Sequence, residues 1–312
     1  MKKSHFIKNL EEGKIIETIF LVVEKEIKQK KDGKGDYLYL VLRDRTGKIS
    51  AFMWDNFEKI HKDIEPGTII KIKGSVHSYK EKRQIVLQNL EIYKEEAQLK
   101  DFLPSTDKDI EFLFKRALEK IDSLNNEKIK NLLKKIFTNP EYKPLILQVP
   151  AAKGYHHACI GGLLEHTVSL LELAELILQH YKDLNRDLLL AGVLLHDIGK
   201  IWELDTKNFF EYTKAGRMVG HITMGVQLLE REAGKIENFP PELKDLLTHM
   251  IISHHGELEY GSPKQPMIKE ALALHFIDLI DSALKGFDEI MEQENSDFSY
   301  SQQLGRFIFK TE

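Results

Sequence analysis

The 312-residue chain has little cysteine and no long hydrophobic segment. Cys159 is its single cysteine, so no disulfide can form within the chain, and a reducing compartment is its natural environment. No stretch reaches the ~20 consecutive apolar residues of a membrane-spanning helix. The basic opening, MKKSHFIKNLEEGK, lacks the apolar core of a secretory signal. These absences predict a cytoplasmic protein without a membrane partner.

Charge is unevenly distributed along the chain. Residues 1–100 contain 21 Lys and Arg against 16 Asp and Glu, whereas residues 101–312 contain 24 against 33. The formal net charge of −4 therefore combines a basic first part with an acidic second part. This asymmetry suits two parts with different functions, but ordinary surface variation would also produce it, so charge alone decides nothing.

Residues 13–94 show the period-two alternation of β-strands. In DYLYLVLRDRTGKISAFMWD, two alternating runs flank Arg45-Thr46-Gly47, which predicts a β-hairpin. The segment PGTIIKIKGSVHSYKEKRQIVLQNLEIY predicts a second hairpin, and IIETIFLVVEKEIKQ predicts a first strand. We expect a short helix over residues 56–62, between the third and fourth strands. Five short strands with a helix in this place are typical of an OB-fold barrel, which we assign to residues 1–94.

Aromatic and basic residues alternate along these predicted strands. Single-strand binders combine a basic groove with aromatic side chains on which bases stack. The same aromatic residues could instead fill the interior of the barrel. Together with the basic balance of this part, the set favours binding of RNA or single-stranded DNA. The candidate substrate-binding residues here are Tyr37, Tyr39 and Trp54.

After the barrel, the sequence changes to helical spacing. The segment DIEFLFKRALEKIDSLNNEKIKNLLKKIF repeats apolar residues at helical intervals and is interrupted at Asn125-Asn126. It predicts two amphipathic helices within a connector over residues 95–143. From residue 144 to 312 the pattern is almost entirely helical, which predicts a separate all-α domain.

Ten of the thirteen histidines lie between His156 and His275. Several stand on strongly apolar segments such as LLHDIGK, where an unpaired polar group is costly to bury. A divalent metal ion can satisfy an imidazole and a carboxylate together. Nitrogen and oxygen donors without a thiolate disfavour a structural zinc cluster and suit Mn²⁺, Fe²⁺ or Mg²⁺. The candidate ligands are His166, His196, Asp197, His221, His254, His255 and either Asp278 or Asp281.

The order of these residues resembles the H…HD…D signature of the HD-domain phosphohydrolases, which are all-helical metal enzymes acting on phosphoesters. Here His166, His196-Asp197 and Asp278 carry the signature. The additional His221 and His254-His255 resemble its extended version, which implies a second metal ion. The extended pattern also favours Asp278 over Asp281.

A closer resemblance covers essentially the whole chain. The segments YHHACIGGLLEHT, LLHDIGK, GHI, ISHHGELEYGSP and HFIDLIDSAL, after an N-terminal OB domain, resemble the YhaM-type 3′→5′ exoribonucleases. This resemblance implies metal-dependent removal of nucleotides from the 3′ ends of RNA or single-stranded DNA. It implies Mn²⁺ as the favoured ion, with Fe²⁺, Mg²⁺ and Co²⁺ as alternatives.

The chemistry of such a site follows from its ligand types. Two cations about 3.5–4 Å apart can bind a phosphodiester, generate hydroxide from water and stabilise the leaving oxygen. We expect Asp197 to bridge them, because a carboxylate offers two oxygens. Lys200 follows about one helical turn later and is expected to neutralise the scissile phosphate, so Asp197 and Lys200 are the catalytic candidates. We assign His166, His196 and Asp278 to one ion, and His221, His254 and His255 to the other.

The remaining histidines allow less specific interpretations. His156 and His157 precede a probable turn at Gly161-Gly162, where they either contact the substrate phosphate or cap the turn. We interpret His180 and His249 as core residues. His275 lies one helical turn before Asp278, which suits a supporting hydrogen bond to a ligand.

Three functions are compatible with these patterns: a nuclease, a hydrolase of small or cyclic nucleotides, and a nucleic-acid-binding protein whose metal is structural. The barrel disfavours the second, because a small substrate needs no strand-binding groove. Lys200 and the seven available ligands disfavour the third. The sequence leaves the choice of RNA or DNA open, and it is compatible with a homo-oligomer.

Overall fold

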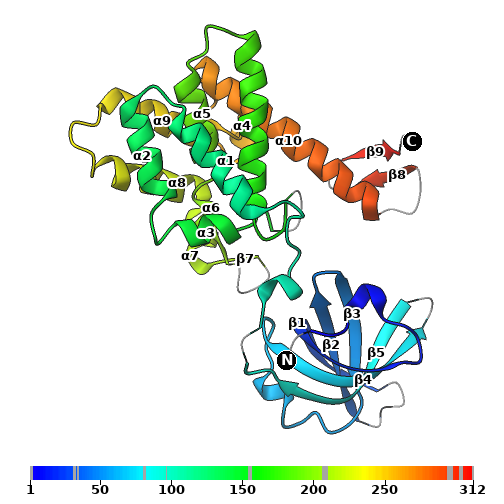
Figure 1. The fold of residues 1–312 in the computed structure, drawn as a ribbon. Helices are drawn as coiled ribbons and strands as arrows, with labels where there is room; N and C mark the ends of the chain where they lie inside the picture. The colour runs from blue at the N-terminus through cyan, green and yellow to red at the C-terminus, as the bar shows by residue number, and fades with distance from the viewer. Residues whose placement is uncertain are drawn as a thin grey trace. The chain divides into compact units, whose positions relative to one another are not determined.

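The computed structural model describes residues 3–30, 33, 35–79, 82–95, 97–153, 157–205, 210–293, 298–301 and 305–310. They form two compact units (Figure 1). The barrel unit ends at residue 105, and the helical unit begins at residue 106. The division therefore falls within residues 95–143, the segment interpreted as a connector.

The barrel unit has the predicted OB-fold. Its strands close in the order β1-β2-β3-β5-β4, with β3 and β5 parallel and the other pairs antiparallel. Along β2, Leu38, Leu40 and Leu42 are fully buried while the residues between them are partly exposed, as expected for one face packed on a core. The strands are β1 (Ile15–Gln29), β2 (Asp36–Asp44), β3 (Gly47–Met53), β4 (Ile69–Tyr79) and β5 (Lys82–Ile92), with 3₁₀ turns η1 (Ile7–Asn9), η2 (His61–Asp63) and η3 (Leu99–Asp101).

The helix expected over residues 56–62 is wrong. Only the short η2 (His61–Asp63) forms between β3 and β4. Asn56 has a φ of 61°, in the left-handed region, which is incompatible with continuing a right-handed helix through it. Phe57 and Ile64 are nevertheless buried in the barrel core, so the segment closes the barrel by packing two side chains.

The helical unit packs its helices around one apolar core. The predicted break at Asn125-Asn126 is confirmed, and Asn126 caps the second helix by accepting hydrogen bonds from two backbone N–H groups. Both helices of the segment 95–143 share the core of the helices that follow them. The helices are α1 (Ile110–Asp122), α2 (Glu127–Phe137), α3 (Lys143–Gln148), α4 (Gly162–His180), α5 (Arg186–Leu195), α6 (Lys200–Glu203), α7 (Lys214–Val219), α8 (His221–Ala233), α9 (Pro241–Ser253), η4 (Leu258–Tyr260) and α10 (Lys269–Gln293).

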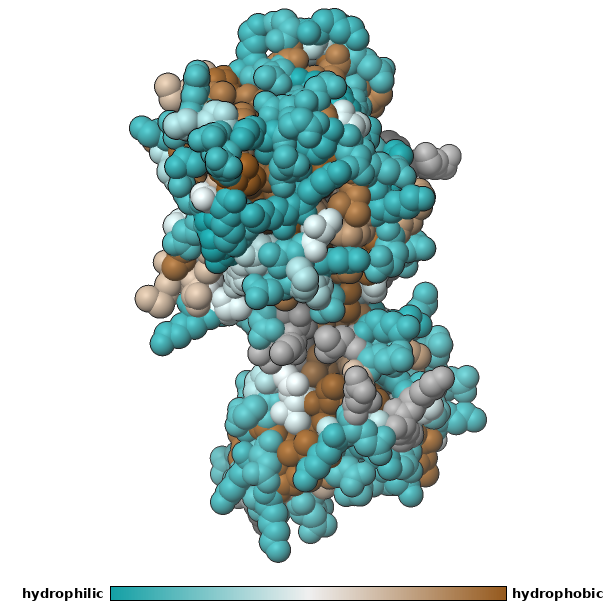
Figure 2. Space-filling view, turned by 60° about the vertical axis from the view of Figure 1, so that its left-hand side comes forward, coloured by the Kyte–Doolittle hydropathy of each residue, from teal (hydrophilic) through white to brown (hydrophobic). Residues whose placement is uncertain are grey.

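Two small hairpins interrupt the helical pattern. They are β6 (Leu204–Asp205) with β7 (Glu211–Tyr212), and β8 (Phe298–Ser301) with β9 (Arg306–Phe309). On the face shown in Figure 2, hydrophilic residues cover most of the helical unit, and the hydrophobic patches between them are small. Among the described residues, no helix combines the length and the apolar character needed to cross a membrane.

Candidate metal centre

The centre forms at the C-terminal end of α5, the most deeply buried helix. Every residue of this helix from Asp187 to Leu195 is buried, so α5 delivers His196 and Asp197 into the interior. Gly199 then allows a close crossing, because a Cβ there would lie 2.0 Å from the carbonyl oxygen of His221. The requirement for glycine at this position is therefore steric. The close crossing brings the start of α8 against the turn that follows His196 and Asp197.

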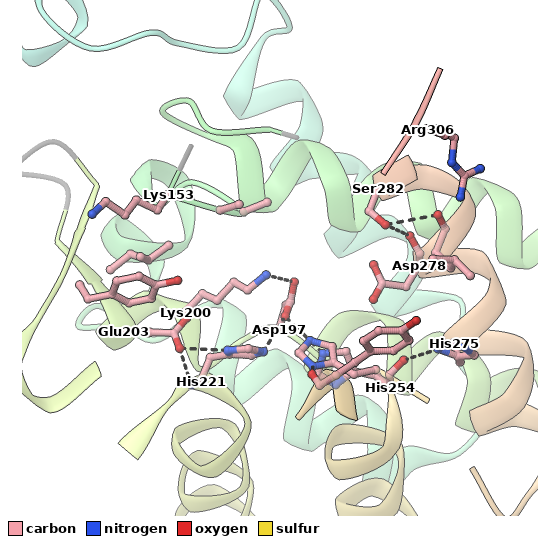
Figure 3. Close-up of a pocket in the computed structure, with 17 residues that line it drawn as sticks. Lys153, Asp197, Lys200, Glu203, His221, His254, His275, Asp278, Ser282 and Arg306 are labelled. Atoms are coloured by element: carbon pink, nitrogen blue, oxygen red, sulfur yellow. Dashed lines mark hydrogen bonds and ion pairs between the residues drawn. The ribbon is translucent and has the colours of Figure 1, made fainter. Parts of the chain in front are cut away.

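Asp197 is the centre of the arrangement, and its two oxygens face different imidazoles. Figure 3 shows it with Lys200, His221 and His254 around it. Its Oδ2 lies 3.3 Å from Nε2 of His196 and 3.9 Å from Nε2 of His166. Its Oδ1 lies 3.5 Å from Nε2 of His221 and 3.6 Å from Nε2 of His254. Four helices thus bring four ring nitrogens to one carboxylate, two on each oxygen.

Three of these imidazoles have fixed tautomers. Backbone carbonyls accept hydrogen bonds from Nδ1 of His196 (Val193 O, 2.8 Å) and Nδ1 of His254 (Ile251 O, 2.6 Å). Glu203 accepts one from Nδ1 of His221 at 3.0 Å. Because carbonyls and carboxylates only accept, Nδ1 carries the proton in each ring and Nε2 offers a lone pair.

The inward-facing atoms have no hydrogen-bond partner among the described residues. Nε2 of His196, His221 and His254 and Oδ1 of Asp197 are buried and lack hydrogen bonds within the described part of the chain. Lone pairs that face one another in a dry interior are costly to leave unsatisfied. Donor atoms about 2.0–2.2 Å from a common ion lie roughly 3–4 Å apart, which matches the distances around Asp197. The residues therefore fit a divalent cation.

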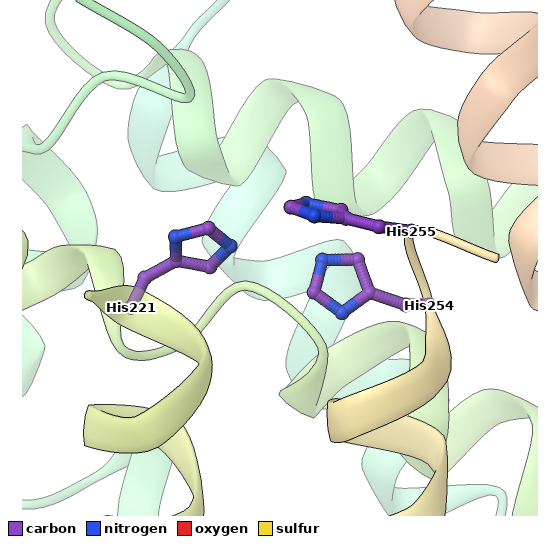
Figure 4. A group of neighbouring side chains, drawn as sticks. All are labelled: His221, His254 and His255. Atoms are coloured by element: carbon purple, nitrogen blue, oxygen red, sulfur yellow. The ribbon is translucent and has the colours of Figure 1, made fainter. Parts of the chain in front are cut away.

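His255 completes a group of three histidines at the more open side of the centre (Figure 4). His221 projects from the start of α8, and His254 and His255 project from the end of α9. One nitrogen from each ring lies within 4.8 Å of the others. Nδ1 of His255 donates to the carbonyl of Tyr260 at 2.9 Å, which directs its other nitrogen toward the group. Burial lowers the pKa of His254 and of His255, which favours the neutral form that binds metals.

Asp278 and Asp281 contact opposite nitrogens of His166. Asp278 Oδ1 lies 3.2 Å from Nε2, the nitrogen that also faces Asp197. Asp281 Oδ2 lies 2.7 Å from Nδ1, on the far side of the ring, and its carboxylate also accepts a hydrogen bond from Ser169. Burial would lower the pKa of His166, but its hydrogen bonds to the two carboxylates raise it to about 9. Asp278 therefore lies on the metal side, and Asp281 orients the ring.

His157 belongs to this orienting network, which favours a supporting role over contact with the substrate. Its side chain is only 4% exposed, with Nε2 3.2 Å from Asp281 and Nδ1 3.5 Å from Glu165. Thr106 donates to the same Glu165 at 2.6 Å. His157 is not among the residues that line the cavity. His156 lies outside the described residues.

Lys200 pairs directly with the central carboxylate. Its Nζ donates to Asp197 Oδ2 at 2.6 Å. Burial would lower the pKa of Lys200, but the charge of Asp197 raises it, so the ammonium stays protonated. The side chain also lines the cavity above the centre, where its charge is available to an anion.

The centre opens into a cavity of about 610 Å³. Besides Asp197, Lys200 and the ligand candidates His221, His254, His255 and Asp278, its walls include further cationic and aromatic side chains. Figure 3 shows Lys153 and Arg306 at opposite sides of the cavity. The additional lining residues with such side chains are Lys153, Tyr212, Tyr260 and Arg306.

The other histidines divide into supporting and peripheral residues. His275 lines the cavity, and its Nδ1 lies 2.9 Å from the carbonyl of His254, the kind of supporting contact that its spacing predicts. His249 is partly buried, and its Nε2 accepts a hydrogen bond from the backbone of Met267. The assignment of His180 to the core is wrong, because it is exposed at the end of α4, where the apolar face of the helix has ended.

Three supporting residues carry no signal in the sequence. Glu203 also accepts a hydrogen bond from the backbone N–H of His221 at 2.9 Å, which fixes the start of α8. Glu165 and Ser169 lie on α4 beside His166 and complete the network around Asp281. Each is an ordinary polar residue of a helix, and only the folded arrangement shows its partner.

The aromatic residues along β2 and at the end of β3 lie outside the barrel core. Tyr37 and Trp54 have ring centroids 4.7 Å apart, and Tyr39 and Phe52 have theirs 5.3 Å apart. Trp54 is 42% exposed, whereas aliphatic residues fill the interior between β2 and β3. The four rings form a continuous aromatic surface, so the alternative in which they fill the barrel does not apply.

Two domain families match the two units. The HD domain profile matches residues 163–283, and the profile of an OB-fold nucleic acid binding domain matches residues 21–93. The chain is therefore an OB-fold protein with an HD domain, and HD domains use divalent metal ions.

Relatives that match most of the chain specify the family. A 3′-5′ exoribonuclease YhaM from Geobacillus sp. (strain WCH70) is 35% identical over 277 residues, which cover 88% of this chain and 85% of that protein. The protein of the same name from Bacillus subtilis (strain 168) is 34% identical, and the match covers 88% of this chain and 87% of that protein. The one from Bacillus velezensis is also 34% identical, and the match covers 91% of this chain and 90% of that protein. This chain belongs to the YhaM family of 3′-5′ exoribonucleases.

Proposed function

We propose that this protein is a metal-dependent 3′→5′ exoribonuclease that hydrolyses phosphodiester bonds of RNA. The proposal rests on the Nε2 atoms of His196, His221 and His254, which face Asp197 without a hydrogen-bond partner among the described residues. In each of these rings, a hydrogen bond from Nδ1 on the opposite side holds Nε2 toward the carboxylate. Membership of the YhaM family supports the polarity and the substrate.

Two divalent ions, with Mn²⁺ favoured, would activate water and stabilise the leaving oxygen when bound. In this proposal Asp197 would be shared by both ions. His166, His196 and Asp278 would complete the site of one ion, and His221, His254 and His255 that of the other. The pairing of two imidazoles on each carboxylate oxygen supports this division.

The chain's own residues would orient the ligands and the substrate. Asp281 and Glu203 hold the rings of His166 and His221 in position. Lys200 keeps Asp197 ionised and places a cation beside the phosphate, where negative charge increases during the reaction. Lys153 and Arg306 line the same cavity and would attract further phosphates of the strand.

We assign strand binding to the barrel, residues 1–94, with residues 95–143 as connector and residues 144–312 as the hydrolytic domain. Tyr37, Tyr39 and Trp54 would stack on bases, and Lys28, whose Nζ lies 3.8 Å from the centre of the Tyr39 ring, would contact the backbone. Stacking on rings does not select the sugar, so single-stranded DNA is a second expected ligand. Action in the cytoplasm is part of the proposal.

The test uses linear RNA and DNA labelled at either end, with Mn²⁺, Mg²⁺ or chelator, beside circular RNA. We expect a ladder of shortening products from 5′-labelled RNA, slower degradation when the 3′ hydroxyl carries a phosphate, and intact circles. Cleavage of circles as fast as linear strands would identify an endonuclease. Full turnover in a verified metal-free sample would contradict the metal-dependent site.

A further inference from the structure

The surface of α10 carries an apolar stripe. Between residues 272 and 284, every exposed position is apolar. The two aspartates of this segment, Asp278 and Asp281, turn inward and contact His166. Figure 1 shows α10 extending beyond the other helices of the unit. We define the α10 stripe as Leu272, Phe276, Leu279, Ile280, Ala283 and Leu284; its five large side chains are between 47% and 65% exposed.

The hairpin that follows α10 adds an aromatic surface. Tyr300 pairs with Phe307 across β8 and β9, and Phe309 pairs with Phe298 two positions further along the hairpin. The rings of Tyr300, Phe307 and Phe309 are 53% to 63% exposed, whereas Ile308, on the opposite face of β9, is buried. The hairpin thus uses its aliphatic face for packing and leaves its aromatic face in water.

Exposed apolar surface of this extent marks an interaction site. Large apolar and aromatic side chains have areas on the order of 150–250 Å², and about half of each is exposed here. Five from the stripe and three from the hairpin would together bury roughly 800 Å² per chain, which is about one side of a standard stable interface.

The charges around the stripe exclude two kinds of partner. Nucleic acid binding requires cations on the surface, and the exposed positions between 272 and 284 include none. A helix that lies in a membrane interface carries an excess of Lys and Arg beside its apolar face. Here the flanks are mixed in sign, with Lys269 and Glu270 before the stripe and Lys285 and Asp288 after it.

The spacing of the stripe fits a second copy of the same helix. Leu272, Phe276, Ile280 and Leu284 follow one another at intervals of four and form a single ridge along α10. Helices most often pack by interdigitating such ridges, and two identical ridges interdigitate in each other's grooves. Ala283 leaves a shallow position beside the ridge that a neighbouring side chain can enter.

We propose that the α10 stripe and the aromatic face of the β8–β9 hairpin form the interface of a symmetric homodimer. An apolar, uncharged surface with a self-complementary ridge is suited to an isologous contact, in which the same patch serves both chains. Leu279 belongs to the stripe and also lines the catalytic cavity, so the second chain lies next to the entrance of that cavity. This proposal does not depend on the reaction that the site performs.

Sedimentation velocity and light scattering of the full chain over a range of concentrations test the proposal. We expect a particle of about twice the 36.2 kDa chain mass. Phe276→Asp and, separately, Ile280→Asp should raise the dissociation constant about 100-fold or more, since each places a charge in the apolar interface. Phe112→Asp is the matched control, because Phe112 is 60% exposed on α1, away from the stripe, and should leave the dimer unchanged.

Circular dichroism and melting curves show whether each variant folds. Because there are two separate stripe variants, the test still works if one of them does not fold. A wild-type chain that stays monomeric up to its solubility limit would overturn the proposal. A dimer that persists in both folded stripe variants would also overturn it. The same holds if the chain is a monomer that binds anionic lipid vesicles and loses this binding in the stripe variants.

Discussion

Each unit buries a carboxylate beside a lysine, and the two centres differ in how their polar atoms are satisfied. In the barrel, Asp44 Oδ2 lies 3.4 Å from Lys3 Nζ and accepts a hydrogen bond from the backbone of Ile7, while Oδ1 accepts two from Thr46. Lys3 also donates to the carbonyl of Ile19 and lies 3.6 Å from the centre of the Phe20 ring. Both side chains have partners for their buried charge.

In the helical unit, Asp197 has a lysine at 2.6 Å but faces four imidazole nitrogens, three of which have no hydrogen-bond partner in the part of the chain that the structure describes. The comparison separates two uses of buried charge. A carboxylate surrounded by donors ties segments of the fold together. A carboxylate surrounded by lone pairs is incomplete until a cation binds, and its cost in stability is consistent with a functional role.

The largest expected effect is the loss of activity on changing Asp197. Asp197→Ala should lower the turnover of RNA by about 10⁴-fold or more, because both proposed ions lose their shared ligand. Circular dichroism should show that the variant is folded, so that the loss of turnover reports on the site. The exposed His180→Ala is the control and should keep full activity. A folded Asp197→Ala chain that keeps the turnover of the wild type would contradict the assignment of this residue to the catalytic centre.

The opposite result is expected for Asp44. Asp44→Ala leaves Lys3 buried without its counter-ion and should lower the free energy of unfolding of the barrel unit by about 3–5 kcal/mol. Cleavage of a dinucleotide by the folded fraction should be unchanged. Denaturant unfolding followed by the fluorescence of Trp54 measures the first effect. A loss below 1 kcal/mol would show that the two centres do not differ as proposed.

Metal addition should stabilise only the incomplete centre. At 100 times its dissociation constant, Mn²⁺ should increase the free energy of unfolding of the helical unit by about 2.7 kcal/mol. Asp197→Ala and His254→Ala should reduce this gain, while Asp44→Ala should not. Calorimetric titration into chelator-treated protein gives the stoichiometry, and one ion per chain would contradict the dinuclear assignment.

The aromatic surface of the barrel should affect binding more than chemistry. Trp54→Ala should weaken binding of single-stranded RNA by about 1–3 kcal/mol, the contribution of stacking on one aromatic side chain. The rate of dinucleotide cleavage should stay the same, because the catalytic ligands are unchanged. Tyr79→Ala, which removes an exposed ring of the same barrel outside this cluster, is the control. Fluorescence anisotropy measures affinity, and an equal loss in both variants would contradict a specific stacking site.

The smallest effect concerns pH and the barrel. Burial lowers the pKa of Lys3 from 10.5 to about 8. Between these values the native state has released a proton that the unfolded state still holds, so stability rises with pH. Relative to Lys3→Met, the wild type should gain about 1 kcal/mol between pH 8 and pH 9. Unfolding curves at the two pH values measure the difference, and a constant difference would mean that Lys3 does not titrate there.

Much of the architecture could be predicted from local patterns. Alternation at period two identified the barrel strands because each strand buries one face, as Leu38, Leu40 and Leu42 do. Helical spacing and the break at Asn125-Asn126 identified α1 and α2. The motif around His196 and Asp197 was informative because histidine and aspartate are rare on a fully buried helix. These features depend on residues close in sequence.

The sequence by itself therefore determined the two folds, the order of the ligand candidates and the family resemblance. Only the tertiary structure decided the side of His166 on which Asp278 and Asp281 lie, the enclosure of His157 and the support of His221 by Glu203. Each of these depends on contacts between segments far apart in the chain, and side-chain direction across such contacts is set by packing. The exposure of the α10 stripe was decided in the same way, because an apolar helical face has the same sequence pattern whether or not the core covers it.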